Sequence, residues 1–92
     1  MTVEANVRVF NLPDVGEGLV EARVVEVLVS EGQAVKRFDT IVEVDTDKST
    51  VELSAPWAGT VRKIHVEVGD YVEVGKPVLE IELAADEEGE AS

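Results

Sequence analysis

The chain has 92 residues, of which 45% are hydrophobic and 4% aromatic, and this length suits one small globular domain. Twenty Asp and Glu residues against eight Lys and Arg residues give a net charge of −12, which disfavours binding to nucleic acid or to anionic membranes. Cysteine is absent and His65 is the only histidine, so disulfides, cysteine nucleophiles and multi-histidine metal centres are excluded, and no metal site is expected.

Valine dominates the apolar positions, which predicts an all-β domain because β-branched residues suit pleated, half-buried surfaces. The first strand is predicted over residues 7–12 and ends at Pro13. The loop that follows contains Gly16 and Gly18, which permit a tight turn. Its glycine spacing is too short for a phosphate-binding loop, and no lysine follows.

In residues 20–29 the even positions as far as Val24 hold Val20, Ala22 and Val24, whereas the odd positions from Val25 onward hold Val25, Val27 and Val29. Because side chains alternate along a strand, this switch predicts a bulge or a bend, at which the strand could pass from one sheet to another. Residues 61–68 show the same switch after Val61.

The second half of the chain repeats the first at a fixed offset. Residues 69–72 match residues 32–35, and residues 78–81 match residues 41–44. Two copies favour a quasi-two-fold sandwich of interleaved halves over a solenoid. In that arrangement the last strand corresponds to the strand before Lys48, so the chain should leave the domain at the end opposite this lysine.

Strand-like residues 41–44 and 51–53 flank a polar stretch that has Lys48 near its centre. This pattern predicts a hairpin with Lys48 at its tip. No Asn-Gly or Asp-Gly pair is present, so a type I turn around Asp47 and Lys48, without positive φ angles, is favoured over a primed turn. Exposed hairpin lysines most often serve solubility, so the turn alone assigns no function.

No constellation of catalytic groups is recognisable in the sequence. His65 falls within a predicted strand at a polar position, which favours a surface residue over a general base. Asp45 and Asp47 precede the turn lysine, but the glycine and the terminal glutamate of an EF-hand loop are missing. The domain by itself is therefore expected not to be an enzyme.

The domain is expected to span residues 1–83. Residues 84–92 are acidic and lack an apolar period, so they are expected to form a disordered tail or the start of an interdomain linker. The N-terminal residues contain Glu4 and no long apolar run, which argues against a signal peptide or a membrane span. A cytoplasmic location is expected, or the mitochondrial matrix in a eukaryote.

Three motifs in register carry a family resemblance. They are Leu-Pro-Asp-Val-Gly-Glu-Gly at residues 12–18, Glu-Val-Asp-Thr-Asp-Lys-Ser at 43–49 and Ser-Ala-Pro-Trp-Ala-Gly at 54–59. Together they resemble the lipoyl domain of the dihydrolipoamide acyltransferase component of 2-oxo acid dehydrogenase complexes, over about residues 7–83. One departure is Ser49, where that family commonly has alanine.

The resemblance implies a flattened β-barrel, or sandwich, of two four-stranded antiparallel sheets, and a monomeric isolated domain. It also implies lipoic acid in amide linkage to Lys48, as a swinging arm for acyl groups and reducing equivalents. The implied partners are a thiamine diphosphate-dependent 2-oxo acid decarboxylase, the acyltransferase core, dihydrolipoamide dehydrogenase, and the lipoate ligase or lipoyl transferase. Which 2-oxo acid is handled stays open.

Roles are carried over from the family only at matching positions. Recognition of the turn by the modifying enzyme is implied for Asp47, Asp45 and Ser49, and recognition by the decarboxylase for the loop of Gly16, Glu17 and Gly18. Gly59 and Gly69 are expected to be turn residues.

Three alternatives share parts of this pattern. A biotinyl carrier domain presents its lysine in the same turn but usually has methionine on both sides, where this chain has Asp47 and Ser49. The glycine-cleavage H protein is longer and lacks the Gly-Glu-Gly opening. An unmodified barrel-sandwich adaptor would use the hairpin for contact only.

Overall fold

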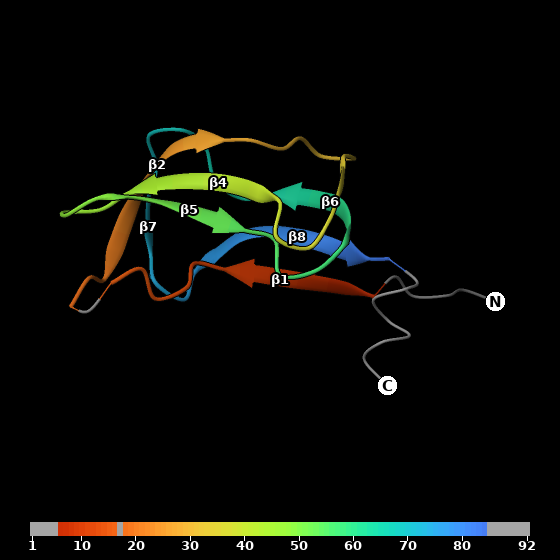
Figure 1. The fold of residues 1–92 in the computed structure, drawn as a ribbon, viewed down its shortest axis with the longest axis horizontal. Coiled ribbons are helices and arrows are strands. Elements are labelled where there is room, and N and C mark those ends of the chain that lie inside the picture. The colour runs from red at the N-terminus through yellow and green to blue at the C-terminus, as the bar shows by residue number, and fades with distance from the viewer. Residues whose placement is uncertain (1–5, 17, 85–92) are drawn as a thin grey trace.

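The computed structural model describes residues 6–16 and 18–84, and every regular element in this part of the chain is a β-strand (Figure 1). No helix in these residues is long and apolar enough to cross a membrane. In chain order the strands are β1 (Val7–Asn11), β2 (Glu21–Val27), β3 (Ala34–Val35), β4 (Thr40–Asp45), β5 (Thr50–Ser54), β6 (Gly59–Ile64), β7 (Tyr71–Glu73) and β8 (Pro77–Leu83).

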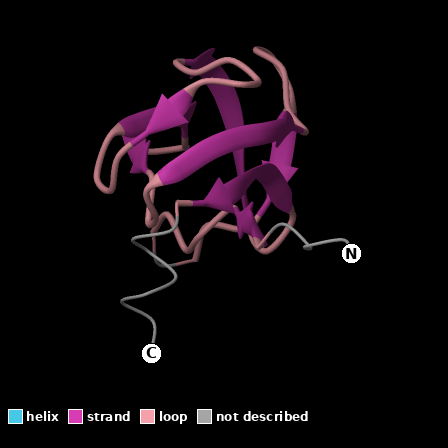
Figure 2. Cartoon of the chain, turned by 90° about the vertical axis from the view of Figure 1, so that its right-hand side faces the viewer, coloured by secondary structure: helices cyan, strands magenta, loops and turns pink. Residues whose placement is uncertain are grey.

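The strands form two four-stranded antiparallel sheets that face each other across one core (Figure 2). The strand orders are β1-β8-β6-β3 and β5-β4-β2-β7. The core is entirely apolar among the described residues, and its most buried large side chains are Leu12, Val24, Ile41, Val42, Val44, Val61, Val78, Leu79 and Ile81. The predicted all-β sandwich is therefore confirmed.

The two sheets are related by the sequence repeat. β2, β3 and β4 of the first half correspond to β6, β7 and β8 of the second, and β1 takes the place of β5. The predicted quasi-two-fold arrangement is thus present. The short strands β3 and β7 were not predicted, because two or three residues are too few to show alternation.

Both predicted bulges are present. The register of β2 against β4 shifts between Val24 and Glu26, and that of β6 against β8 shifts between Val61 and Lys63. The expectation that such a strand could change sheets is wrong, because each stays within one sheet and the bulge only turns its side chains over.

The second bulged strand is also shorter than predicted. β6 ends at Ile64, so His65 lies just beyond the strand. The His65 backbone N–H still donates to Val78 O (2.8 Å), and its Nε2 lies 2.8 Å from Glu80 Oε2. His65 is thus a surface residue, as predicted, although it is not within a strand.

The two candidate turn glycines differ. Gly69 has a φ of 100° and is a turn residue as expected. Gly59 instead begins β6, and a Cβ atom there would lie 2.1 Å from the Glu82 carbonyl oxygen. The prediction for Gly59 is wrong, because the close approach of β8, and no turn, requires glycine at this position.

The β4–β5 turn lies at one end of the molecule, whereas the start of β1 and the end of β8 lie together at the other (Figure 1). This confirms that the described chain leaves the domain opposite Lys48. The expected tail spans residues 84–92, of which Ala84 is described and donates its backbone N–H to Ala58 O (3.0 Å). Residues 85–92 lie outside the described residues.

Candidate functional site: the lysine turn

Lys48 lies in the loop of residues 46–49 that connects β4 to β5. The two strands pair up to Asp45 and Thr50, so the loop is closed directly beneath the lysine. Lys48 is exposed, and within the described residues its amine has no hydrogen bond or ion pair. The loop residues have negative φ angles, as predicted, since Phe38 is the one described non-glycine residue with a positive φ.

The hydroxyl group of Thr46 organises this loop. Its Oγ1 accepts hydrogen bonds from the backbone N–H of Lys48 (3.2 Å) and of Ser49 (3.1 Å), and it donates to Ser49 O (2.8 Å). The Thr46 N–H also donates to Ser49 O (2.8 Å). A side-chain oxygen thus accepts the Ser49 N–H, which the carbonyl of Thr46 would accept in an ordinary hydrogen-bonded type I turn.

Thr46 was not identified by the sequence reasoning, which concentrated on the charged residues. A signal was available, because threonine in a short polar turn often bonds to backbone groups two or three residues further on.

The three residues expected to help recognition of the turn have different environments. The Asp45 carboxylate accepts a hydrogen bond from Thr50 Oγ1 (3.2 Å), which ties it to the base of the hairpin. Asp47 is exposed, and no described residue bonds to its side chain. Ser49 contributes its backbone N–H and C=O to the loop, while its hydroxyl takes no part in the bonds among the described residues.

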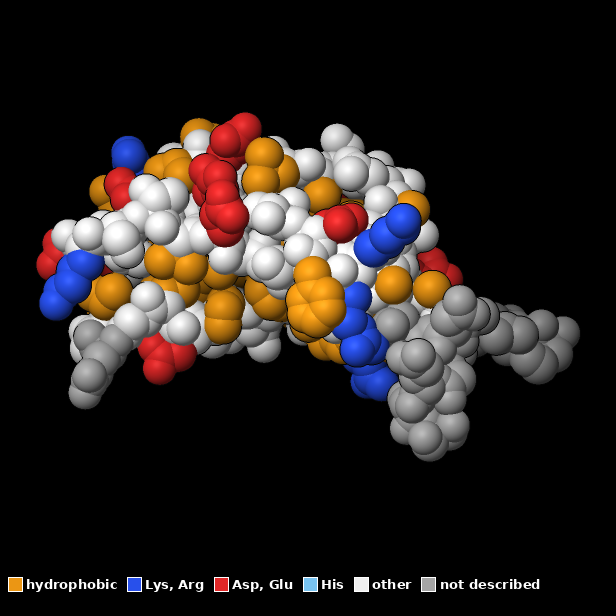
Figure 3. Space-filling view, in the orientation of Figure 1, with side chains coloured by type: hydrophobic (Ala, Val, Ile, Leu, Met, Phe, Trp, Pro, Cys, Tyr) orange, Lys and Arg blue, Asp and Glu red, His pale blue; other side chains and the backbone are white. Residues whose placement is uncertain are grey.

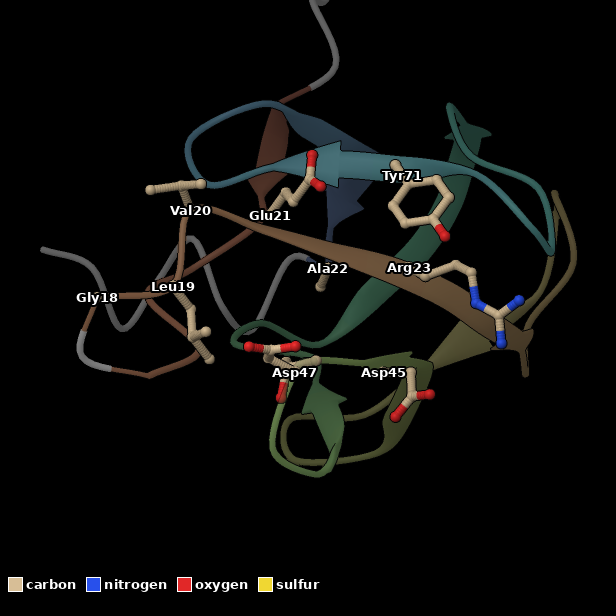
Figure 4. A pocket seen from close by; sticks show the side chains of 10 residues that line it. Gly18, Leu19, Val20, Glu21, Ala22, Arg23, Asp45, Asp47 and Tyr71 are labelled. Carbon is tan, nitrogen blue, oxygen red and sulfur yellow. The ribbon is translucent and has the colours of Figure 1, made fainter.

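A groove of about 470 Å³ adjoins the turn (Figure 4). Residues 18–23 form one side, residues 45–47 form the other, and Tyr71 lies at one end. In Figure 4, Arg23 lies between Tyr71 and Asp45, and Leu19 and Asp47 lie together at the opposite end. The groove therefore brings the loop after β1 beside the lysine turn.

The residues predicted in that loop are not all in the groove. Gly18 lines it, whereas Gly16 lines an adjoining hollow with Asp14 and Val74. The Gly16 N–H donates to Asp14 Oδ1 (3.1 Å). Glu17 lies outside the described residues, so its predicted role has no geometry to support it.

Two exposed apolar residues beside the groove were also missed by the sequence reasoning. The exposed fractions are 72% for Val20 and 69% for Tyr71, and both residues line the groove. Alternation alone could not identify them, because the strand pattern shows which face a residue occupies but not whether another element covers that face.

The surface beyond the turn is acidic. Glu26, Glu43 and Glu52 stand opposite one another on β2, β4 and β5, and we call them the glutamate row. Figure 3 shows acidic side chains gathered over β2 and β4. Partial desolvation, followed by repulsion from Glu26 and Glu52, raises the pKa of Glu43 above its ordinary value.

The chemistry available at the turn is that of an accessible primary amine. Such an amine can form an amide with a carboxylic acid, and its position at a hairpin tip leaves room for both a modifying enzyme and an attached group. Within residues 6–16 and 18–84, no three His, Cys, Asp or Glu side chains are grouped to bind a metal ion.

Comparisons with known proteins agree on the kind of domain. Residues 8–81 match the family model described as "Biotin-requiring enzyme". The lipoamide acyltransferase component of the branched-chain alpha-keto acid dehydrogenase complex of Bos taurus is 41% identical over 76 residues, which are 83% of this chain and 16% of that protein. The acetyltransferase component of the pyruvate dehydrogenase complex of Mycoplasma genitalium is 46% identical over 67 residues, 73% of this chain and 17% of that protein.

This chain therefore spans about one sixth of the length of these two relatives. Among solved structures, the lipoyl domain of the 2-oxoglutarate dehydrogenase complex from Azotobacter vinelandii has a TM-score of 0.66 and 29% identity, over 79% of this chain and 92% of that one. A multi-domain long-chain acyl-CoA carboxylase, with a TM-score of 0.75 and 21% identity over 92% of this chain and 8% of its own, shows the same fold. The chain therefore belongs to the family of biotin- and lipoyl-attachment domains and is a non-catalytic carrier domain of the lipoyl type.

Proposed function

We propose that Lys48 carries lipoic acid in amide linkage and serves as a swinging arm within a 2-oxo acid dehydrogenase complex. The observation that carries this proposal is the position of Lys48, an exposed amine at the tip of a closed hairpin, at the end of the molecule opposite the start of β1 and the end of β8 (Figure 1). A domain tethered at the latter end presents its lysine outward.

The chain's own contribution is a firm base for a flexible arm. β4 and β5 pair up to the residues next to the loop, and Val42 and Val44 of β4 are buried in the core, so the hairpin cannot move independently of the domain. The attached dithiolane supplies the acyl-accepting and redox chemistry. Tethering keeps the effective concentration of the arm high at each enzyme that it visits.

The proposed partners follow from this role. They are a thiamine diphosphate-dependent decarboxylase that loads the arm, an acyltransferase core that unloads it, and dihydrolipoamide dehydrogenase that reoxidises it. A lipoate ligase or lipoyl transferase would modify Lys48, with Asp47 as the accessible recognition residue of the turn. The similar proteins include mitochondrial and bacterial components, and the proposed location is correspondingly the matrix or the bacterial cytoplasm.

Intact mass after separate incubation with a lipoate ligase and a biotin ligase tests the proposal. We expect one lipoyl increment on the wild type and none on Lys48→Ala. The Lys48→Ala variant should retain its stability to within about 0.5 kcal/mol, because the side chain is exposed.

Each other outcome would contradict the proposal in a distinct way. A biotinyl increment instead of a lipoyl increment would assign the domain to a carboxylase. No increment from either ligase would favour an unmodified adaptor. A lipoyl increment that persists in Lys48→Ala would place the attachment site elsewhere, with Lys36, Lys63 and Lys76 as the remaining lysines.

A further inference from the structure

We propose that Thr46 is the positioning residue for Lys48, and that its hydroxyl group sets the backbone conformation in which the modifying enzyme receives the lysine. This inference rests on the proposed function, since it assigns the residue that presents the amine for attachment. Its basis is the set of hydrogen bonds around one oxygen atom, Thr46 Oγ1.

The two N–H groups that Thr46 Oγ1 accepts belong to the two peptide planes on either side of the Lys48 Cα atom. The Lys48 N–H lies in the plane shared with Asp47, and the Ser49 N–H lies in the plane shared with Lys48. Peptide units are planar, so fixing both planes fixes φ and ψ of Lys48. One side-chain oxygen thus determines the direction in which the lysine leaves the backbone.

The hydroxyl is used to its full capacity. It has two acceptor positions and one proton, and it accepts two hydrogen bonds and donates the third, to Ser49 O at 2.8 Å. A carboxylate at this position could accept both N–H groups but could not donate to Ser49 O. Threonine and serine therefore share a bonding pattern here that valine, alanine and aspartate lack.

Without this hydroxyl the loop would lose three of the four hydrogen bonds that the described residues form within it. The ladder between β4 and β5 ends at Asp45 and Thr50, leaving the Thr46 N–H bond to Ser49 O as the remaining backbone–backbone bond within the loop. Residues 47 and 48 would then sample several conformations. An enzyme that binds one of them must offset the lost conformational entropy, so catalytic efficiency should fall while the folded domain persists.

The test compares Thr46→Val, Thr46→Ser and Thr60→Val with the wild type. Thr46→Val keeps the side-chain shape and removes the hydroxyl. Thr46→Ser restores the hydroxyl, and Thr60→Val makes the same replacement on β6 of the opposite sheet, where the threonine hydroxyl forms no hydrogen bond among the described residues. For each variant, kcat/KM of lipoyl transfer by a lipoate ligase is measured below the unfolding midpoint, together with amide hydrogen exchange of Lys48 and Ser49 in the unmodified domain.

We expect Thr46→Val to accelerate exchange at both amides and to lower kcat/KM by about tenfold, since a hydrogen bond typically contributes free energy of that order. Thr46→Ser should restore both quantities to within about twofold, and Thr60→Val should leave both within the same margin. The unfolding temperature should be nearly the same in all variants, whereas kcat/KM should fall only in Thr46→Val.

Three results would overturn the inference. A normal transfer rate in Thr46→Val would show that loop order does not matter for attachment. Unchanged exchange in Thr46→Val would show that the bonds do not restrain Lys48, and failed rescue by Thr46→Ser would show that the hydroxyl alone does not present the lysine. Failure of the proposed function looks different, because the wild type itself would then take no lipoyl group while the exchange measurement still reports on the loop.

Discussion

Phe38 has a backbone conformation that its side chain does not favour. Its φ is 78°, in the left-handed region, and its side chain is 78% exposed. The corresponding residue of the second half is Gly75, with a φ of 93°. Both residues lie in the connection to the following long strand, so the fold requires a left-handed residue here and only one half provides glycine.

We therefore expect Phe38→Gly to stabilise the domain by about 0.5–1 kcal/mol, because relief of left-handed strain exceeds the entropy that glycine adds to the unfolded chain. Urea unfolding would measure the change. Gly75→Ala is the matched control and should destabilise by about 1 kcal/mol, since a Cβ has open space there and only the backbone is strained. A loss of stability in Phe38→Gly would show that the exposed ring contributes packing that offsets its strain.

At the scale of elements, the outer faces of the two sheets differ in charge although their strands correspond. On the sheet of β5, β4, β2 and β7, Glu43 faces Glu26 and Glu52, and the three residues form the glutamate row. On the sheet of β1, β8, β6 and β3, the equivalent residue is Glu80. It faces Lys63, and its carboxylate lies 2.8 Å from the imidazole of His65. Glu26 and Lys63 thus occupy equivalent positions with opposite charges, and the fold accepts both. The glutamate row is therefore a property of this sequence and is not required by the fold.

The row should make stability depend on pH. The pKa of Glu43 is raised in the folded state, so the folded domain binds this proton more tightly than the unfolded chain does. Its contribution is favourable at low pH and is lost as the pH rises through that pKa. We expect Glu43→Gln to raise the unfolding temperature at about pH 7 and to change it little at about pH 4, as measured by calorimetry.

The control for this prediction is Glu80→Gln on the opposite sheet. It removes a carboxylate that faces a lysine and a histidine, so it should not raise the unfolding temperature at neutral pH. An equal gain in both variants would reflect the high overall negative charge and would not support repulsion within the row.

At the scale of the whole molecule, one thin apolar core supports both the hairpin and the chain ends. Ile81 is fully buried on β8, in a sheet whose central strands are β8 and β6. A domain of this size has a modest margin of stability, on the order of 5 kcal/mol. The stability that is lost with a few methyl groups of the core is therefore a large part of the total stability.

We expect Ile81→Val to cost about 1 kcal/mol and Ile81→Ala about 2–5 kcal/mol, because the removed methyl groups leave a cavity between the sheets. Urea unfolding of both variants would measure this. Val9→Ala, on the outer face of β1 with 46% exposure, should cost about 0.5 kcal/mol or less. Similar losses for Ile81→Ala and Val9→Ala would mean that the sheets do not pack as described.

Several features of this protein followed from the sequence because their causes are local. The switch from even to odd apolar positions at Val24 predicted the bulge in β2, since alternation is a property of a single strand. The polar stretch between two apolar runs predicted the hairpin with Lys48 at its tip, and the repeat predicted that the chain leaves at the opposite end. The motifs around residues 12–18 and 43–49 identified the family.

Other features were decided by tertiary structure alone. Gly59 is required by a backbone carbonyl of β8, far away in sequence, and the glutamate row exists only once β2, β4 and β5 are in register. The groove beside the lysine turn likewise needs the loop after β1 to fold against the hairpin. Composition and alternation determine which face of a strand is apolar, but which strands become neighbours depends on long-range pairing, and that pairing decides the contacts, charges and hollows around Lys48.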